Sequence, residues 1–212
     1  MLCSFTKIIT YLISKDEYLS RHRNLLSKRL VHESSISLDA ERNLASKIAE
    51  AMGSGPVRSI LEMLADVATS EDQKKQFSQK KPDNPIKPLT CSDTDWPGLI
   101  PNPKAILPGE MELFTKEFEQ FYRQLFVSRE LTWILSEGRG EVQARFAEKR
   151  YVLDVKTYQM TILLRFNERS EYTFRKLKEL TGINEDLLNE YLVIFTNQVP
   201  VLRRGDGSKK VS

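Results

Sequence analysis

The sequence predicts an α+β fold that is predominantly α, and two patterns lead to this prediction. Apolar residues recur at helical spacing through most of the first 80 residues and again after residue 157. Between these regions, short runs alternate apolar and polar residues with the period of two that is typical of β-strands. We therefore expect part of a helical bundle, then a small antiparallel sheet, then a second helical region.

Residues 1–80 are predicted to form the portion of a helical bundle. A helical stretch from Phe5 to His32 is interrupted by a turn at residues 14–16. Ser37 is placed to cap the next helix, because its hydroxyl can accept a hydrogen bond from a backbone N–H of the first turn. Apolar spacing predicts a third helix over residues 57–67. The helix breakers between the second and third helices are Gly53, Gly55 and Pro56.

A proline-rich connector is predicted at residues 81–107. It interrupts the helical pattern, because proline lacks the N–H donor that a helix interior requires. Pro108 then fits the first turn of a new helix, where that donor would have no partner in any case. The apolar and largely aromatic face of this helix consists of Met111, Phe114, Phe118, Phe121, Tyr122 and Leu125.

Residues 108–156 are predicted to combine this helix with the sheet in an α/β domain. The alternating runs that predict three short strands are residues 131–135, 142–146 and 151–155. Gly138 and Gly140 would supply the turn between the first two strands. The edges of so small a sheet can accept a further strand from a partner through backbone hydrogen bonds. The alternative is that the aromatic helix and the connector cover those edges.

Residues 157–202 return to the helical pattern. One short helix extends from Thr173 to Leu180, and Asn184 opens another, with acidic residues in its first turn. Residues 199–202 resemble a strand, and three helices followed by a strand is the order of a winged helix. Residues 203–212 are polar and contain glycine, so we expect this tail to be disordered.

The sequence contains no recognisable catalytic, cofactor-binding or metal site. His22 and His32 have no serine or cysteine in a nucleophile motif to act with. Cys3 and Cys91 lack the CxxC spacing of a zinc site and are expected to be free thiols in a reducing compartment. We therefore expect a non-catalytic chain that needs no cofactor.

Membrane and nucleic-acid partners are disfavoured. The apolar run from Leu2 to Ile13 is too short to span a bilayer and lacks the cleavage site of a signal peptide, so we expect a cytoplasmic or nuclear protein. The net charge of +3 is diffuse. A winged helix can bind DNA, but Glu185 and Asp186 would repel phosphate in the helix that enters the groove. Nucleic-acid binding is the alternative function.

Several segments resemble the cullin family, the scaffolds of multisubunit ubiquitin ligases. The most specific are Leu131-Thr132-Trp133 and, further on, the run Tyr158-Gln159-Met160-Thr161-Ile162-Leu163-Leu164-Arg165-Phe166-Asn167. The other matching segments, in the family's order, are Leu26–His32, Ser37–Glu41, Thr94-Asp95-Trp96-Pro97, and Leu107-Pro108 before the helix that ends at Phe121-Tyr122. The match extends from about Phe5 to Leu202.

The resemblance implies a function as well as an architecture. In cullins, part of a four-helix bundle is followed by an α/β domain and then by a winged helix, the same order as the segments predicted here. Their α/β sheet accepts an N-terminal strand from a RING-box protein, whose RING then recruits a ubiquitin-conjugating enzyme. The seat that this resemblance implies would be formed or supported by Leu131, Trp133, Val142, Ala144, Phe146, Tyr151 and Leu153.

The chain also departs from the family pattern. Residues 126–130 read Phe-Val-Ser-Arg-Glu where cullins commonly have His-Ser-Gly-Arg-Lys, so an acid replaces the usual lysine at Glu130. Neither the N-terminal repeats that hold a substrate adaptor nor a second winged helix with its modification lysine is recognisable. We therefore expect a scaffold truncated at both ends, and a degenerate fragment without a partner is a further alternative.

Overall fold

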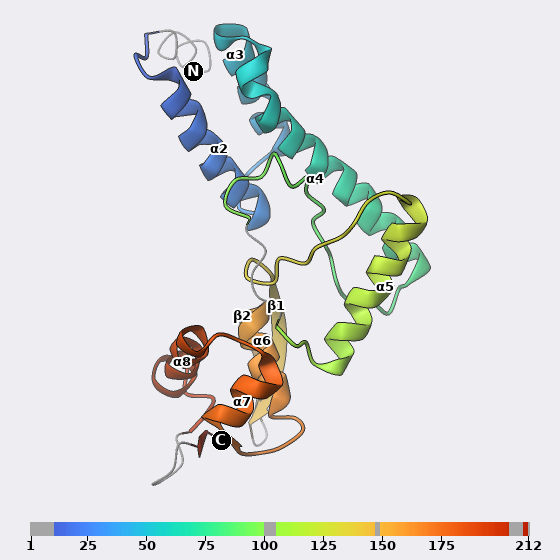
Figure 1. Ribbon diagram of the computed structural model, residues 1–212, viewed down its shortest axis with the longest axis vertical. Helices are drawn as coiled ribbons and strands as arrows, with labels where there is room; N and C mark the ends of the chain where they lie inside the picture. Colours follow the sequence, from blue (N-terminus) through green and yellow to red (C-terminus); the bar gives the residue numbers. More distant parts are fainter. Residues whose placement is uncertain (1–10, 100–104, 147–148, 204–209, 212) are drawn as a thin grey trace. The chain divides into compact units, whose positions relative to one another are not determined.

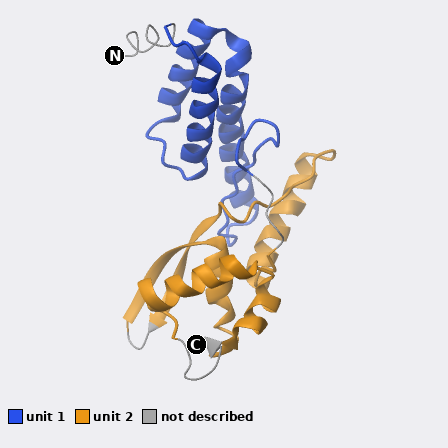
Figure 2. Cartoon of the chain, turned by 60° about the vertical axis from the view of Figure 1, so that its left-hand side comes forward, with its two compact units in different colours: residues 1–99 blue, residues 100–212 orange. Residues whose placement is uncertain are grey.

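The computed structural model describes residues 11–99, 105–146, 149–203 and 210–211, with only the backbone described at residues 146, 210 and 211. The chain divides into two compact units, residues 1–99 and 100–212 (Figure 2). Helices dominate both units, and a short antiparallel hairpin lies in the second (Figure 1). The predicted α+β, predominantly α class is confirmed.

Unit 1 contains three described helices, α2 (Lys15–Val31), α3 (Leu38–Met52) and α4 (Ser54–Lys80), and α4 contacts both of the others. The predicted cap at Ser37 is confirmed, because its hydroxyl accepts a hydrogen bond from the Ala40 N–H at 3.3 Å. The buried core of this unit consists of Leu19, Leu26, Leu30, Ala45, Ile48, Val57, Ile60, Met63, Leu64, Val67 and Trp96.

The second half of α4 is held by polar contacts as well as by the buried side chains of Val67 and Phe77. Ser70 and Gln73 are buried on this helix. The Thr90 backbone N–H donates to the Ser70 hydroxyl at 2.9 Å, and the Thr90 hydroxyl donates to the Gln73 side-chain oxygen at 2.7 Å. These bonds attach residues 89–99, here called the return segment, to α4. The helix continues to Lys80, which is also the last residue of the predicted helical region 1–80.

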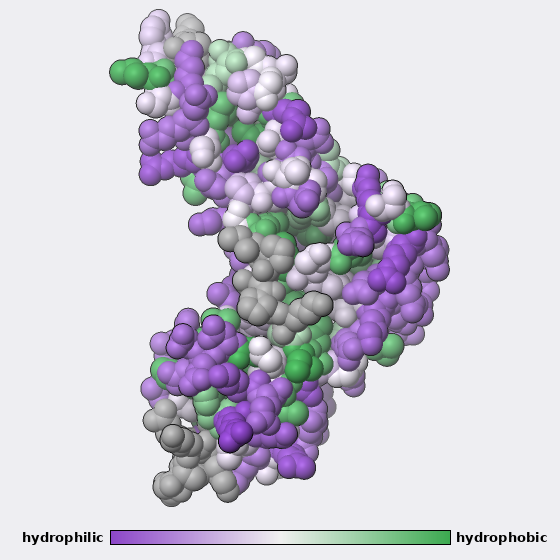
Figure 3. All heavy atoms as spheres, in the orientation of Figure 1, coloured by the Kyte–Doolittle hydropathy of each residue, from purple (hydrophilic) through white to green (hydrophobic). Residues whose placement is uncertain are grey.

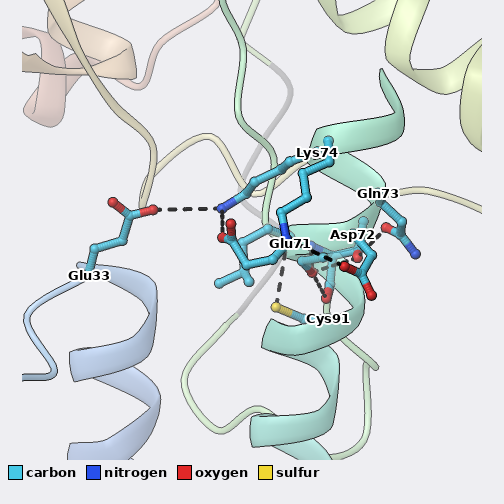
Figure 4. Close-up of polar contacts among 10 residues, drawn as sticks. Glu33, Glu71, Asp72, Gln73, Lys74 and Cys91 are labelled. Atoms are coloured by element: carbon cyan, nitrogen blue, oxygen red, sulfur yellow. Dashed lines mark hydrogen bonds and ion pairs between the residues drawn. The ribbon is translucent and has the colours of Figure 1, made fainter. Parts of the chain in front are cut away.

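An ion-pair cluster lies on the same part of α4. The Lys74 side chain is largely buried and extends between two acids (Figure 4). Its ammonium lies 2.8 Å from Glu71, one turn away on α4, and 3.7 Å from Glu33, which follows α2. The cluster therefore links the end of α2 to the second half of α4.

A second ion pair in unit 1 makes its stability depend on pH. Arg29 Nε and Nη2 donate to the two carboxylate oxygens of Glu41 at 2.9 and 3.0 Å. Burial alone would raise the pKa of Glu41, but the hydrogen bonds and charge of Arg29, with a hydrogen bond from Ser35, outweigh it and lower that pKa. The folded state thus binds fewer protons than the unfolded state near the usual carboxyl pKa.

The stabilisation from this pair is expected to be lost on acidification. It is fully present above the unfolded pKa of Glu41 and disappears as the pH falls through the lower folded pKa. Denaturant unfolding at a series of pH values should show a steeper loss of stability below about pH 4.5 in the native chain than in Glu41→Gln. Equal slopes in the two proteins would contradict this assignment.

Unit 2 begins with α5 (Gly109–Leu125), whose visible surface is mostly hydrophilic (Figure 3). The elements that follow are β1 (Arg139–Phe146), β2 (Lys149–Lys156), α6 (Thr157–Arg165), β3 (Tyr172–Thr173), α7 (Phe174–Thr181), α8 (Glu185–Val193), the π-helical turn η1 (Ile194–Gln198) and β4 (Lys210–Val211). Pro108 occupies the N-cap of α5, at the predicted helix start.

The caps of the C-terminal helices follow the predicted signals. Asn184 accepts a hydrogen bond from the Asp186 N–H at 3.0 Å, and Gly182 ends α7 with a positive φ of 64°. The core beneath these helices consists of Tyr158, Ile162, Tyr172, Leu177, Ile183, Leu188, Tyr191, Leu192, Phe195 and Leu202. Three helices, α6 to α8, thus share one core.

The structure corrects two strand predictions. Residues 131–135 are not a strand, so the predicted three-stranded sheet is wrong at its first member, and β1 and β2 pair only with each other among the described residues. Residues 199–202 are not a strand either. The N–H groups of Val201 and Leu202 both donate to the carbonyl of Phe195, so this segment closes the end of η1 instead of joining a sheet.

The tail and the predicted glycine turn also differ from expectation. Lys210 and Val211 pair with β3, although the tail was predicted to be disordered; residues 204–209 and 212 lie outside the described residues. Gly138 and Gly140 do not reverse the chain between strands. They lie at the start of β1 against α6, where a Cβ on Gly138 would overlap Thr157 and one on Gly140 would approach the Met160 methyl.

Candidate partner-binding sheet

The β1–β2 hairpin is the longer of the two described sheets of unit 2, and its backbone can still pair with another chain. Its register is continuous over eight residue pairs, from Arg139 opposite Lys156 to Phe146 opposite Lys149. Neither strand pairs with a third strand within the described residues. Each strand therefore has an outer edge with backbone N–H and C=O groups available to an added strand.

One side of the hairpin is apolar and becomes more exposed toward its tip. Directly opposed residues of an antiparallel pair lie on the same side of the sheet. The Thr157 N–H donates to the Gly138 carbonyl at 2.9 Å, which places α6 at the base of the hairpin (Figure 1). Val155, near this base, is 7% exposed, whereas Tyr151, near the tip, is 46% exposed. The cover that α6 provides thus ends before the tip.

Four of the predicted seat residues lie together on this apolar side: Val142 opposite Leu153, and Ala144 opposite Tyr151. Phe146 pairs with Lys149 through its backbone, and its side chain lies outside the described residues. Leu131 and Trp133, the other two predicted residues, are half-buried and lie outside the strands. The structure therefore separates the predicted residues into a sheet group and a preceding segment.

The segment before the hairpin is anchored to α5. Trp133 Nε1 donates to the Glu119 carboxylate at 2.8 Å, and the Trp133 ring meets Phe118 edge-on at 6.0 Å. This use of the tryptophan explains why residues 131–135 do not join the sheet. Sequence reasoning missed Glu119. A buried indole N–H needs a hydrogen-bond acceptor, but the sequence does not show which residue provides the accepting oxygen.

The other side of the hairpin carries charges arranged in rows, where a row is one pair of directly opposed residues. From base to tip, the four rows are Arg139 with Lys156, Glu141 with Asp154, Gln143 with Val152, and Arg145 with Arg150. All eight side chains are exposed. The charge rows therefore read positive, negative, neutral and positive. The register that creates them could not be obtained from alternation alone.

His22 and Cys91 each lie in surroundings that do not favour a reactive role. His22 stacks on Tyr18 with ring centroids 5.9 Å apart, and burial together with the charge of Arg29 lowers the His22 pKa. Burial and the nearby carboxylate of Asp66 raise the pKa of the Cys91 thiol to about 12, so it remains protonated and weakly nucleophilic. Cys3 lies outside the described residues.

The described ranges contain neither a cluster of metal-binding side chains nor a membrane-spanning helix. No group of three or more histidine, cysteine, aspartate and glutamate side chains there is arranged to hold a metal ion. Among the helices of those same ranges, none combines the length and apolar character required to cross a membrane. The hairpin with its two open edges is the feature best suited to binding a partner.

Comparison with known proteins identifies the family. A family model described as the cullin alpha+beta domain matches residues 90–212, more than half of the chain. The chain belongs to the cullin family. A second model, described as the cullin alpha solenoid domain, matches residues 1–74, the region that the sequence resemblance assigned to the helical bundle. The resemblance to cullins predicted from the motifs is thus confirmed.

Individual cullins align with most of this chain. Cullin-1 from Schizosaccharomyces pombe is 32% identical over 215 residues, which cover 98% of this chain and 28% of that protein. Cullin-1 and Cullin-6 from Caenorhabditis elegans are each 31% identical and cover 84% and 81% of this chain, and 24% of their own lengths. This cullin chain thus spans about a quarter of the length of these curated relatives.

Proposed function

We propose that this chain is a non-catalytic scaffold segment of a cullin-RING ubiquitin ligase, and that it binds a RING-box protein by strand addition to the β1–β2 hairpin. The observation that carries the proposal is the pair of open strand edges beside an apolar side that α6 covers only near its base. Both features lie within the residues that match the cullin alpha+beta domain.

The predicted seat residues would contribute to binding in two different ways. Val142, Ala144, Tyr151 and Leu153 flank the open edges and offer apolar contacts to an added strand. Leu131 and Trp133 support the seat indirectly, because Trp133 ties the segment before the hairpin to Glu119 of α5. Backbone hydrogen bonds supply the affinity in this mode, and side-chain contacts supply the specificity. The bound RING-box protein, not this chain, would recruit the ubiquitin-conjugating enzyme.

Proline substitutions at neighbouring positions test the proposal. In an antiparallel pair, successive residues direct their N–H groups alternately toward the partner strand and toward the open edge. Proline is tolerated on a strand only where its missing N–H would have faced outward. Of Val142→Pro and Gln143→Pro in β1, one should therefore unfold the hairpin, while the other leaves it folded. Val152→Pro and Leu153→Pro make the same comparison in β2.

Co-purification with a co-expressed RING-box protein is the measurement, and circular dichroism identifies the folded variants. We expect the native chain to capture the RING-box protein. The proline variant that stays folded and lies in the accepting strand should capture about tenfold less, because it cannot form all the backbone hydrogen bonds to the added strand. Val127→Pro, at a position 97% exposed and outside the strands, is the control and should retain capture. A folded native chain that captures no RING-box protein would refute the proposal.

A further inference from the structure

The charge rows are unusual for a hairpin that has no other partner. Three of the four rows place like charges directly opposite each other: Arg139 with Lys156, Glu141 with Asp154, and Arg145 with Arg150. Like charges at such positions destabilise an antiparallel pair, whereas opposite charges stabilise it. The directly opposed pairs within these three rows therefore do not stabilise the hairpin.

The six charged side chains of these rows also form no ion pair with any other described residue, and all six are exposed. Because both members of a row have the same sign, the row presents that sign at the β1 edge and at the β2 edge alike. A strand added to either edge would place one of its residues in line with each row. Each row thus offers the same electrostatic preference to any incoming strand.

We propose that the charge rows select the incoming strand and fix its register. The proposal rests on strand addition as the mode of binding. The favoured strand carries an acid at the row of Arg139, a base at the row of Glu141, a neutral residue at the row of Gln143 and an acid at the row of Arg145. The residues between these positions are apolar, because they fall on the other side of the sheet.

The rows discriminate against both kinds of register error. A shift by one residue would turn the apolar residues of the incoming strand to the charged side. A shift by two residues would bring its first acid to the row of Glu141 and Asp154, where like charges repel. The order of acid, base, neutral and acid differs when read backward, so the rows also distinguish the two strand directions.

The apolar side of the hairpin fits the same occupant. Tyr151 is 46% exposed and lies opposite Ala144, beyond the part that α6 covers. An added strand in the proposed register would direct apolar side chains toward this row while its charged side chains meet the charge rows. The partner surface is therefore an amphipathic strand whose charged side alternates in sign.

Two synthetic nine-residue peptides of equal composition provide the test. Both alternate charged or neutral residues with apolar ones; the first has the order acid, base, neutral, acid on its polar side, and the second has its base and first acid exchanged. Fluorescence anisotropy measures the binding of each peptide to the full chain. We expect the first peptide to bind about tenfold more tightly, since each reversed row exchanges a favourable pair for an unfavourable one.

Reversal of one row should abolish that preference. In Glu141→Lys with Asp154→Lys, the second row becomes positive, so each peptide meets one of the first two rows with an opposite charge and the other with a like charge, and the two peptides should bind about equally. The control is Glu62→Lys with Asp83→Lys, which changes the same net charge at two exposed sites of unit 1 and should leave the preference unaltered. The preference should also weaken as salt is added.

The outcomes separate this proposal from strand addition itself. Equal binding of the two peptides, or a preference that the row reversal does not change, would overturn the proposed role of the charge rows. If the proline variants nevertheless lose RING-box capture in that case, strand addition remains supported. If the native chain captures no RING-box protein but discriminates between the peptides as expected, the charge rows stand and the partner assignment falls.

Discussion

Replacement of Asp66 by alanine is expected to destabilise unit 1 by about 3 kcal/mol, because one carboxylate oxygen holds the return segment on α4. Asp66 Oδ2 accepts hydrogen bonds from the Ser92 N–H and hydroxyl, both at 2.9 Å, and from Trp96 Nε1 at 2.8 Å. Trp96 is only 4% exposed. The substitution would leave its indole N–H without an acceptor in a buried setting, which is more costly than the loss of an exposed bond.

The thiol of Cys91 reports the same change locally. Cys91 lies in the return segment, and burial and the Asp66 charge raise its pKa to about 12. In Asp66→Ala, both causes weaken, so the thiol should react faster with a disulfide reagent at pH 8 in a Cys3→Ser background. Asp66→Asn keeps an acceptor oxygen and should fall between the native chain and the alanine variant. An unfolding free energy of Asp66→Ala within 1 kcal/mol of the native value would contradict this role.

Local signals predicted the fold well where a side chain finds its partner within a few residues. Ser37 bonds to a backbone N–H three residues away, and Asn184 to one two residues away. Gly182 ends α7 through its own left-handed backbone conformation. Such contacts depend on residue type and short spacing alone, so the sequence contains all the information needed to place them.

Contacts across long separations explain the failures. Residues 131–135 have the alternation of a strand, but Trp133 instead bonds to Glu119 on α5. The helical pattern of residues 1–80 likewise does not reveal that Ser70 on α4 bonds to Thr90, twenty residues further on. In both places the chain uses a tertiary partner that pattern reasoning cannot identify.

The candidate site was predictable in part for the same reason. Alternation correctly put Val142 and Ala144 on one side of a strand and Gln143 on the other. It could not reveal that Glu141 faces Asp154, since opposition across a hairpin depends on register. The charge rows, and with them the selectivity proposed for the sheet, therefore emerge only once the strands are paired.

Replacement of Arg165 by alanine is expected to destabilise unit 2 by about 3–4 kcal/mol, because a buried guanidinium there joins three segments. Arg165 Nη2 donates to the carbonyls of Ile106 at 3.3 Å and Leu180 at 3.1 Å, and Nη1 donates to Glu168 at 3.1 Å. Its side chain is 10% exposed. Alanine would leave two backbone carbonyls without these donors and a cavity at the end of α6.

The size of the effect should depend on guanidinium geometry rather than on charge. Arg165→Lys keeps the charge, but a single ammonium cannot reach Ile106, Leu180 and Glu168 as the forked guanidinium does, so about half of the loss should remain. Glu168→Gln removes a largely exposed partner and should cost less than about 1 kcal/mol. A lysine variant as stable as the native chain would show that charge alone suffices.

Hydrogen exchange at one amide can locate the damage. The Ile106 N–H donates to the Thr181 carbonyl at 2.8 Å, next to the carbonyls that Arg165 holds. In Arg165→Ala, the Ile106 amide should exchange faster than global unfolding requires, because residues 105–107 detach first from the end of α7. These residues lead directly into α5, which holds Trp133 through Glu119. If the Ile106 amide exchanges only with global unfolding, Arg165 stabilises the unit as a whole and does not hold this entry segment.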